Sequence, residues 1–509
     1  MAARCSKIPA MARRLLAAPA LLALLPAIAW APAIAWAPAL AWAHGADAGR
    51  AAPMAPPSLE AVRIPALIFA VMLIAGLIAL RRLRGSEYVE RIRNFSPNAR
   101  LLLIRGPFLG LNIGIWNLLF NLYLLAMGHE PAFVAQMISV NWLLHGLIVI
   151  PAGMISDLFG RRVTFLSSYS VNIVTKILLL ITLDPTWLLA LNALSGGAEG
   201  FHSIVGPPFL TEQSRPEERV HLFSADSVLK TSSNFLGSLG AGVLPLAVAF
   251  TVGVSGGSAA ALRGALFFAL PLMIAAWVPI YLIREDWERL SVRRWWSGVR
   301  SYRHIGMLAL TSGIMSVGLG ATAPFFNIYF ATKLHASTEN IGTVFSLGAL
   351  AVAGATLFVP LLAQRWGKVN LIVWVRMAGI PFVLLLGMTD NFLWAAAFYL
   401  ISIVLIGSLF PTLGMVDPIY QLFPMELVEP AERGTTNGII HAFKEFPMAI
   451  GSAAAGFFIA QGLWSPPFWI AGVCYTASFL IYFAYFRRHE VRAGRGEPAA
   501  PAARPGEAV

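Results

Sequence analysis

Several long apolar runs of this chain contain ionisable side chains, which are costly at bilayer depth unless they face water, a substrate or a partner. Histidines and carboxylates can change charge when their access to water changes, and lysines attract anions. The chemistry such residues could carry is proton exchange or the binding of a polar solute. Static pairing between helices, which would only stabilise a helix bundle, is the alternative. The residues are Glu199, His202, Asp226, Lys230, His441, Lys444 and Glu445, with Lys176 and Arg376 in two further runs.

Two of these lysines stand at matching positions. Lys230 lies eleven residues after Arg219, and Lys444 lies eleven residues after Arg433. Eleven residues of helix measure roughly 16 Å, which places both lysines near the middle of a bilayer core of about 30 Å. Asp226 lies one helical turn before Lys230 and could neutralise it.

The composition indicates the elements that position these residues. With 58% hydrophobic and 12% charged residues, the chain has more apolar surface than one soluble core could bury, so it is expected to be an all-α polytopic membrane protein. Stretches of roughly 17 to 25 mainly apolar residues, long enough to cross a bilayer, predict twelve spans after residue 100. They cover approximately residues 102–127, 132–155, 163–183, 186–209, 220–250, 259–283, 305–331, 338–362, 369–389, 391–416, 434–461 and 466–486.

The positions of the cations predict the orientation, because short loops rich in Lys and Arg remain cytoplasmic. Alternate loops are basic and the loops between them carry almost no cations, so both ends of the twelve-span unit are expected in the cytoplasm. The net charge of +12 is therefore attributed to topology, and no nucleic-acid partner is expected. The cations before the first span are Arg81, Arg82, Arg84, Arg91, Arg93, Arg100 and Arg105.

The first hundred residues are an addition to this unit. Residues 1–43 have a basic start, an apolar segment and an Ala-Trp-Ala ending that resembles a signal-peptidase site, so a signal peptide is predicted, with an uncleaved anchor as the alternative. Residues 44–100 contain a further apolar run at about 64–80, which is long enough to form an extra transmembrane helix before a basic linker. A disordered tail is predicted at 489–509.

Internal repetition divides the twelve spans into two halves. The segment Phe120–Leu124 (Phe-Asn-Leu-Tyr-Leu) returns as Phe326–Phe330 (Phe-Asn-Ile-Tyr-Phe), about 206 residues later. Gly160 and Gly367 repeat at nearly the same separation. The repeat predicts six-helix bundles at 101–283 and 305–488, joined by a cytoplasmic loop at 284–304.

The segment Gly153–Arg162 reads Gly-Met-Ile-Ser-Asp-Leu-Phe-Gly-Arg-Arg, a glycine-punctuated hinge between two apolar runs. It resembles the loop signature G-x-x-x-D-x-x-G-R-[RK] of the major facilitator superfamily of transporters. A degraded copy, Pro360–Lys368, has Gln364 in place of Asp157. The resemblance implies two six-helix bundles that bind a solute between them and expose it to each side of the membrane in turn.

In that family the equivalent Asp and Arg hold the cytoplasmic faces of the two halves together, with the Asp near the start of the eleventh helix. A carboxylate is favourable beside a helix N-terminus, so Asp157 is expected to lie near Arg433. Because the second copy lacks the acid, gating is expected to be asymmetric; alternatively, the cations only enforce topology. The predicted gate residues are Gly153, Asp157, Gly160, Arg161, Arg162, Arg219, Gly367 and Arg433.

The sequence has no phosphate-binding Gly-Lys-Ser/Thr loop, metalloprotease motif or nucleophile elbow, so neither an enzyme nor direct drive by ATP is indicated. The two cysteines suggest neither a disulfide framework nor a metal site, and no cofactor is expected. We expect a monomeric secondary transporter of a bacterial plasma (inner) membrane, exporting a small organic solute by proton coupling. Uptake of a solute or an anion attracted by Lys230 and Lys444, a non-transporting sensor and a lipid flippase are alternatives.

Overall fold

The computed structural model describes residues 95–212, 219–283, 301–356, 358–407, 414–428 and 433–494. Over these ranges the chain is helical and contains no strand. The predicted signal peptide at 1–43, the extra helix at 64–80, most of the loop at 284–304 and the end of the tail lie outside the described residues.

The first bundle begins with helices whose starts are fixed by proline or glycine. Pro97, Pro131 and Pro185 each occupy the first helical position, where the missing N–H costs nothing. Gly160, with φ of +91°, forms the turn between the second and third helices, as the hinge motif predicts. The helices are α6 (Pro97–Ala126), α7 (Pro131–Phe159), α8 (Arg161–Ile181), α9 (Pro185–Glu212), α10 (Arg219–Val252), α11 (Ala259–Phe267) and α12 (Ala269–Leu282).

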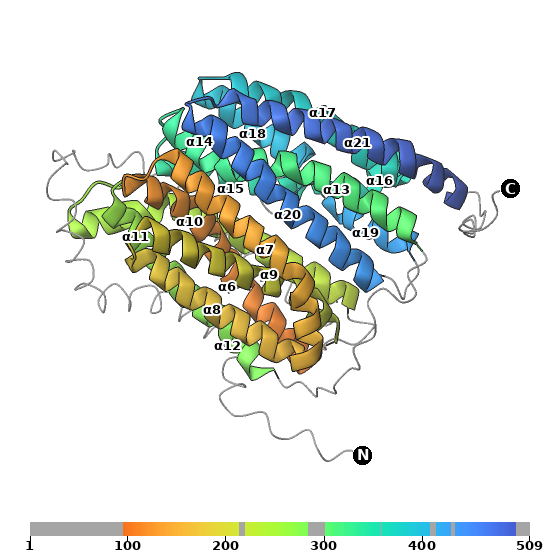
Figure 1. The fold of residues 1–509 in the computed structure, drawn as a ribbon, viewed down its shortest axis with the longest axis horizontal. Helices are drawn as coiled ribbons and strands as arrows, with labels where there is room; N and C mark the ends of the chain where they lie inside the picture. Colours follow the sequence, from red (N-terminus) through yellow and green to blue (C-terminus); the bar gives the residue numbers. More distant parts are fainter. Residues whose placement is uncertain are drawn as a thin grey trace, which may run out of the picture.

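The second bundle repeats this arrangement with more interruptions. Gly367, with φ of +79°, makes the turn that corresponds to Gly160. The helices are α13 (Tyr302–Thr322), η1 (Ala323–Phe325), α14 (Phe326–Thr332), α15 (Thr338–Thr356), α16 (Val359–Trp366), α17 (Lys368–Met388), α18 (Phe392–Leu405), α19 (Asp417–Leu427), α20 (Arg433–Ala460) and α21 (Ser465–Gly494). Figure 1 shows the two bundles side by side.

Eight helical stretches of the described residues are long and apolar enough to cross a membrane by themselves. The span predicted at 391–416 differs from the structure, because α18 ends at Leu405 and α19 begins only at Asp417. Gly407 has φ of +102°, which glycine adopts readily. A Cβ added to Gly414 would lie 3.0 Å from the Gly407 Cα, so these two glycines lie close together between the helices.

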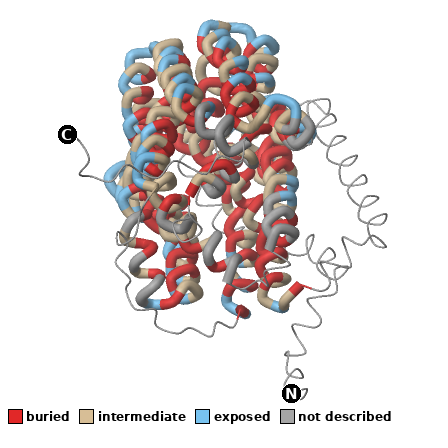
Figure 2. The backbone as a smooth tube through the Cα atoms, turned by 90° about the vertical axis from the view of Figure 1, so that its right-hand side faces the viewer, coloured by how far each residue is buried: buried red, intermediate tan, exposed pale blue. Residues whose placement is uncertain are grey.

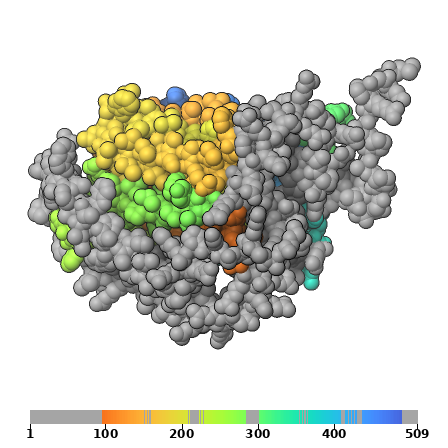
Figure 3. Space-filling view, turned by 90° about the horizontal axis from the view of Figure 1, so that it is seen from below, coloured from red at the N-terminus to blue at the C-terminus, as the bar shows by residue number. Residues whose placement is uncertain are grey.

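Glycines also let helices within a bundle approach closely. A Cβ at Gly110 of α6 would overlap the backbone oxygen of Lys230 in α10, and one at Gly320 of α13 would overlap that of Met448 in α20. Close backbone approach through small residues is the usual packing mode of membrane helices. On the outside of the first bundle, α8 lies beside α12 (Figure 3).

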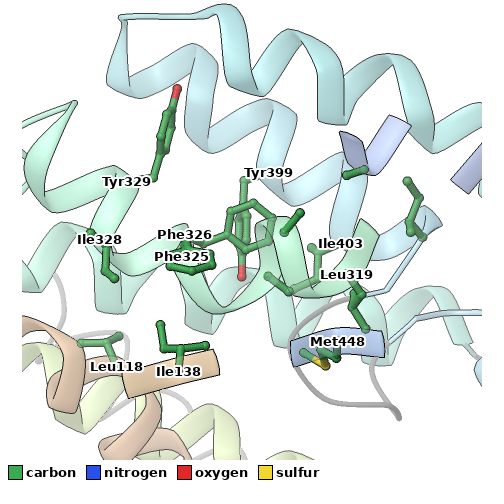
Figure 4. Packing of buried hydrophobic residues seen from close by; sticks show 14 of the residues in the cluster. Leu118, Ile138, Leu319, Phe325, Phe326, Ile328, Tyr329, Tyr399, Ile403 and Met448 are labelled. Carbon is green, nitrogen blue, oxygen red and sulfur yellow. The ribbon is translucent and has the colours of Figure 1, made fainter. Parts of the chain in front are cut away.

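The two bundles contact each other through α7 with α20 and through α10 with α15. Buried residues follow the faces where helices meet (Figure 2). One apolar cluster continues from bundle to bundle, and Figure 4 shows Leu118 and Ile138 of the first facing Phe325 and Ile328 of the second.

Arg100 and Arg105, which were expected before the first span, both lie within its helix α6. The first helix begins at Pro97, and Arg105 is 6% exposed within it. Its guanidinium lies 5.0 Å from the centre of the Phe165 ring, so the aromatic face of α8 contacts this buried cation.

Candidate functional site

A cavity of about 120 Å³ lies where α6, α7 and α9 of the first bundle meet Pro324 of the second. Its walls combine aromatic rings with side-chain amides, and one carboxylate, Glu199, lies at its edge. Because Glu199 stands near the middle of the 28-residue helix α9, the cavity lies beside the middle of that helix. The lining includes Trp116, Phe120, Trp142, Asn117, Asn121, Asn141, Asn192 and Ser195.

Glu199 is held by two residues of α8. Its Oε1 lies 3.3 Å from Lys176 Nζ and accepts a hydrogen bond of 3.2 Å from Asn172 Nδ2. The side chain of Lys176 is 9% exposed and its ammonium lies 4.6 Å from the centre of the Trp116 ring, whereas that of Glu199 is 38% exposed. The carboxylate thus borders the cavity while its counter-charge is buried behind it, so the pair brings no net charge to the cavity.

His202 lies away from this cavity, although it follows Glu199 by three residues. Its ring packs against Phe165 at 4.4 Å and Tyr169 at 4.8 Å between centroids. The structure therefore separates Glu199 and His202, two residues of the predicted coupling set.

Asp226 and Lys230 form the ion pair that their spacing predicts, with 2.5 Å between Oδ2 and Nζ. Gly106 of α6 faces this pair, since a Cβ there would lie 3.4 Å from Asp226 Oδ1. Lys230 is thus neutralised within its own helix. No ion pair to Lys444, its counterpart in α20, occurs among the residues that the structure describes.

A buried ion pair in the second bundle was not predicted. Arg376 Nη2 in α17 lies 2.5 Å from Oδ1 of Asp417, the first residue of α19. Arg376 is 1% exposed and stacks on Tyr420, 4.2 Å from the ring centre. Asp417 Oδ2 also accepts a hydrogen bond from the backbone of Gly414. The sequence could have indicated this pair, because Asp417 directly follows the predicted span at 391–416 and lies soon after Gly407 and Gly414.

At the end of the cavity away from the basic loops, Asn121 of the lining meets Asn327 of the second bundle, and we call this pair the asparagine clasp. Asn327 Nδ2 donates to the backbone oxygens of Asn117 at 3.1 Å and Leu118 at 3.0 Å. Asn121 Nδ2 donates to Asn327 Oδ1 at 3.3 Å and to the oxygen of Pro324 at 3.2 Å. Both asparagines belong to the repeated Phe-Asn-x-Tyr segments, so the two copies of one motif bind each other across the bundles.

The predicted cytoplasmic gate is described only in part. Gly153 is buried in α7, and Gly160 accepts a hydrogen bond of 2.9 Å from Thr164 Oγ1. Arg162 Nη2 donates to the backbone oxygen of Tyr281 at 2.5 Å, so it connects α8 with α12 of its own bundle. The side chains of Asp157, Arg219 and Arg433 lie outside the described residues. A clamp between Asp157 and the start of α20 remains a prediction.

A family comparison identifies the fold. The model of the Major Facilitator Superfamily matches residues 108–443. The chain belongs to the Major Facilitator Superfamily. The resemblance predicted from the hinge motif is thus confirmed, and with it an integral membrane protein of the transporter class.

Solved structures of this superfamily share the fold at low sequence identity. The nucleoside transporter NupG is 13% identical with a TM-score of 0.58, and the alignment covers 76% of this chain and 100% of that one. The human organic anion transporter MFSD10 is 16% identical with a TM-score of 0.53, covering 76% and 99%. An auto-inhibited peptide transporter of the POT family is 12% identical with a TM-score of 0.57, covering 80% and 98%. No curated protein sequence matches the chain.

Proposed function

We propose that this superfamily member is a proton-coupled exporter of a small organic solute that binds in the cavity beside Glu199. The observation that supports the proposal is the position of the cavity, which lies where the first bundle meets Pro324 of the second, beside the middle of α9 and next to the asparagine clasp. Opening the clasp would expose the cavity to the side of the membrane away from the basic loops. Separating the two bundles at the ends that carry the basic loops would expose it to the other side. This is the geometry that alternating access requires.

The lining favours a solute with a ring and several hydrogen-bonding groups. Trp116, Phe120 and Trp142 offer ring faces, while the asparagines offer both donors and acceptors. Glu199 is neutralised by Lys176, so a neutral or zwitterionic solute fits better than a strongly charged one. Among the solutes named for the similar structures, nucleosides combine these features, and we take them as the first class to test.

Protons are the proposed drive because the sequence carries no nucleotide-binding loop while His and carboxylate side chains stand inside its helices. The proposal includes a bacterial inner membrane as the location and a monomer whose two bundles form the complete transport unit. The proposal also assigns gating and coupling to the residues that were predicted for these roles from the sequence.

Uptake of an anion is the second candidate, and Lys444 favours it. In the described part of the chain this mid-membrane lysine has no ion-pair partner. An unpaired ammonium near the bilayer centre attracts anions.

Purified protein in liposomes with an imposed pH gradient separates these functions. If protons are exchanged for solute, protons that leave an acidic lumen drive solute into it. If protons and solute move together, protons that enter an alkaline lumen carry solute with them. Both results are independent of the direction in which the protein is inserted. Radiolabelled uridine and a panel of small organic acids serve as probes, with Glu130→Gln in the loop before α7 as the control. Uridine accumulation in an acidic lumen supports the proposal. Accumulation of acids in an alkaline lumen supports the second candidate, and no flux of any probe indicates the sensor or flippase alternative.

A further inference from the structure

The contact between α7 and α20, which joins the two bundles, has one very close point. A Cβ added to Gly146 of α7 would lie 2.7 Å from the backbone nitrogen of Phe446 in α20. The residues that precede these two are His145 and Glu445. Opposite bundles therefore present an imidazole and a carboxylate at the same level of the interface, near the middle of both helices.

Both side chains are buried, and polar atoms around them lack partners. His145 is 8% exposed and Glu445 is 3% exposed. Among the described residues, His145 Nδ1, His441 Nδ1 and Glu445 Oε2 are buried without a hydrogen bond. His441 Nδ1 lies 3.9 Å from Glu445 Oε1, which is too long for a hydrogen bond. Three unsatisfied polar atoms at one buried interface are unusual, since such atoms are costly to bury.

The charged surroundings of Glu445 come from both bundles. His145 lies on α7 beside the Gly146 contact, while His441 and Lys444 lie on α20 itself, four residues and one residue before Glu445. On α19, which also contacts α20, Asp417 is already paired with Arg376. From α13, the close contacts with α20 are made by Gly313, Val317 and Gly320, which do not titrate.

We propose that His145, His441 and Glu445 form one proton-binding site that spans the interface between the bundles. This inference rests on the proposed function, for which it supplies the place where the coupled proton binds. A proton taken from water onto an imidazole nitrogen makes an imidazolium, which attracts the Glu445 carboxylate and holds α7 against α20. Loss of that proton to the other side of the membrane leaves a neutral imidazole beside a buried carboxylate, so the contact weakens and the bundles can part.

Neighbouring contacts prepare His145 for this role. Its Nε2 lies 3.3 Å from Ser203 Oγ of α9, and its ring stacks on Trp142 with centroids 5.4 Å apart. These contacts orient the ring and leave Nδ1 for the proton.

The site is tested by measuring the separation of the bundles as a function of pH, which needs no substrate. Spin labels are attached to Phe159→Cys and Trp366→Cys, at the matching ends of α7 and α16, after both native cysteines are replaced by serine. These two positions are 64% and 52% exposed. We expect the distance distribution to shift between pH 5 and 8. For one coupled proton, the ratio of the two populations changes by at most about tenfold per pH unit.

Glu445→Gln should abolish the shift, and His145→Asn, on the other bundle, should do the same. Glu130→Gln, outside the interface, should retain it. Two variants on different helices keep the test decisive if one of them does not fold, and elution as a monodisperse peak verifies folding. A wild-type distribution that does not change with pH, or a folded Glu445→Gln variant with the wild-type shift, would overturn the proposal.

The outcome is independent of the transport assay. Solute flux without a pH-dependent distance leaves the proposed transporter in place and removes this proton site. A pH-dependent distance that needs Glu445, without flux of any probe, supports the proton site and removes the proposed function.

Discussion

The asparagine clasp allows a quantitative prediction about the opening of the cavity. Asn327 is 2% exposed and takes part in three hydrogen bonds between the bundles, two as a donor and one as the acceptor from Asn121. Side-chain hydrogen bonds in membrane proteins contribute about 0.6 kcal/mol each on average. Asn327→Ala should therefore favour the open clasp by about 2 kcal/mol, which corresponds to about 30-fold in the population of that state.

A cysteine in the cavity reports this population directly. Ser195→Cys changes one atom of the lining, and its modification by a membrane-impermeant thiol reagent requires the clasp to open. In a background without Cys5 and Cys474, adding Asn327→Ala should raise the labelling rate about 30-fold, in proportion to the open population.

The matched control is Asn370→Ala. Asn370 is also an asparagine, but among the described residues its side chain bonds only to the Trp366 oxygen, one turn earlier in the chain. The Asn370→Ala variant should therefore leave the labelling rate of Ser195→Cys unchanged. A rate in the Asn327→Ala variant within threefold of the parent would refute the assignment of the clasp as a barrier to the cavity.

Three further predictions concern the ion pairs and the glycine contacts. Glu199→Gln leaves the buried lysine beside it without a counter-charge and should lower solute exchange in liposomes at least tenfold, whereas exchange at the parent rate would exclude Glu199 from the binding site. Arg376→Met should destabilise the protein by about 3–5 kcal/mol, because Asp417 would keep a buried charge without a partner. Adding Asp417→Asn should restore most of the thermal stability in detergent, and failure to do so would contradict this reasoning. Gly110→Ala should lower the unfolding temperature by pressing α6 against α10, whereas Gly306→Ala, where a Cβ meets nothing within 4 Å, should not.

Features that depend on neighbours in the sequence could be predicted well. The turns at Gly160 and Gly367 follow from glycines with positive φ between apolar runs. The pair of Asp226 and Lys230 follows from the four-residue spacing of one helix face. The superfamily follows from the hinge motif, because that motif lies within one short segment.

Features that depend on the register between helices could not be predicted. Glu199 was predicted, but its partners Lys176 and Asn172 lie on another helix, whose rotation is set by packing. His145 was missed for the same reason, since its place opposite α20 depends on the Gly146 contact with that helix. The helix period of 3.6 residues shows which positions of one helix share a face. It does not show which residues of a neighbouring helix pack against that face.

The repeat predicts that the two ends of the proposed transport path differ. A residue close to the axis that relates two similar bundles meets its own copy, as Asn121 meets Asn327. The tyrosines two residues later also behave alike, since Tyr123 and Tyr329 donate to the backbone oxygens of Leu180 and Leu386 near the ends of α8 and α17. Both copies of this segment retain their polar residues, so each bundle contributes equally to the clasp. The cytoplasmic hinge retains its acid in one copy only, which predicts that closure at that end depends on the first bundle.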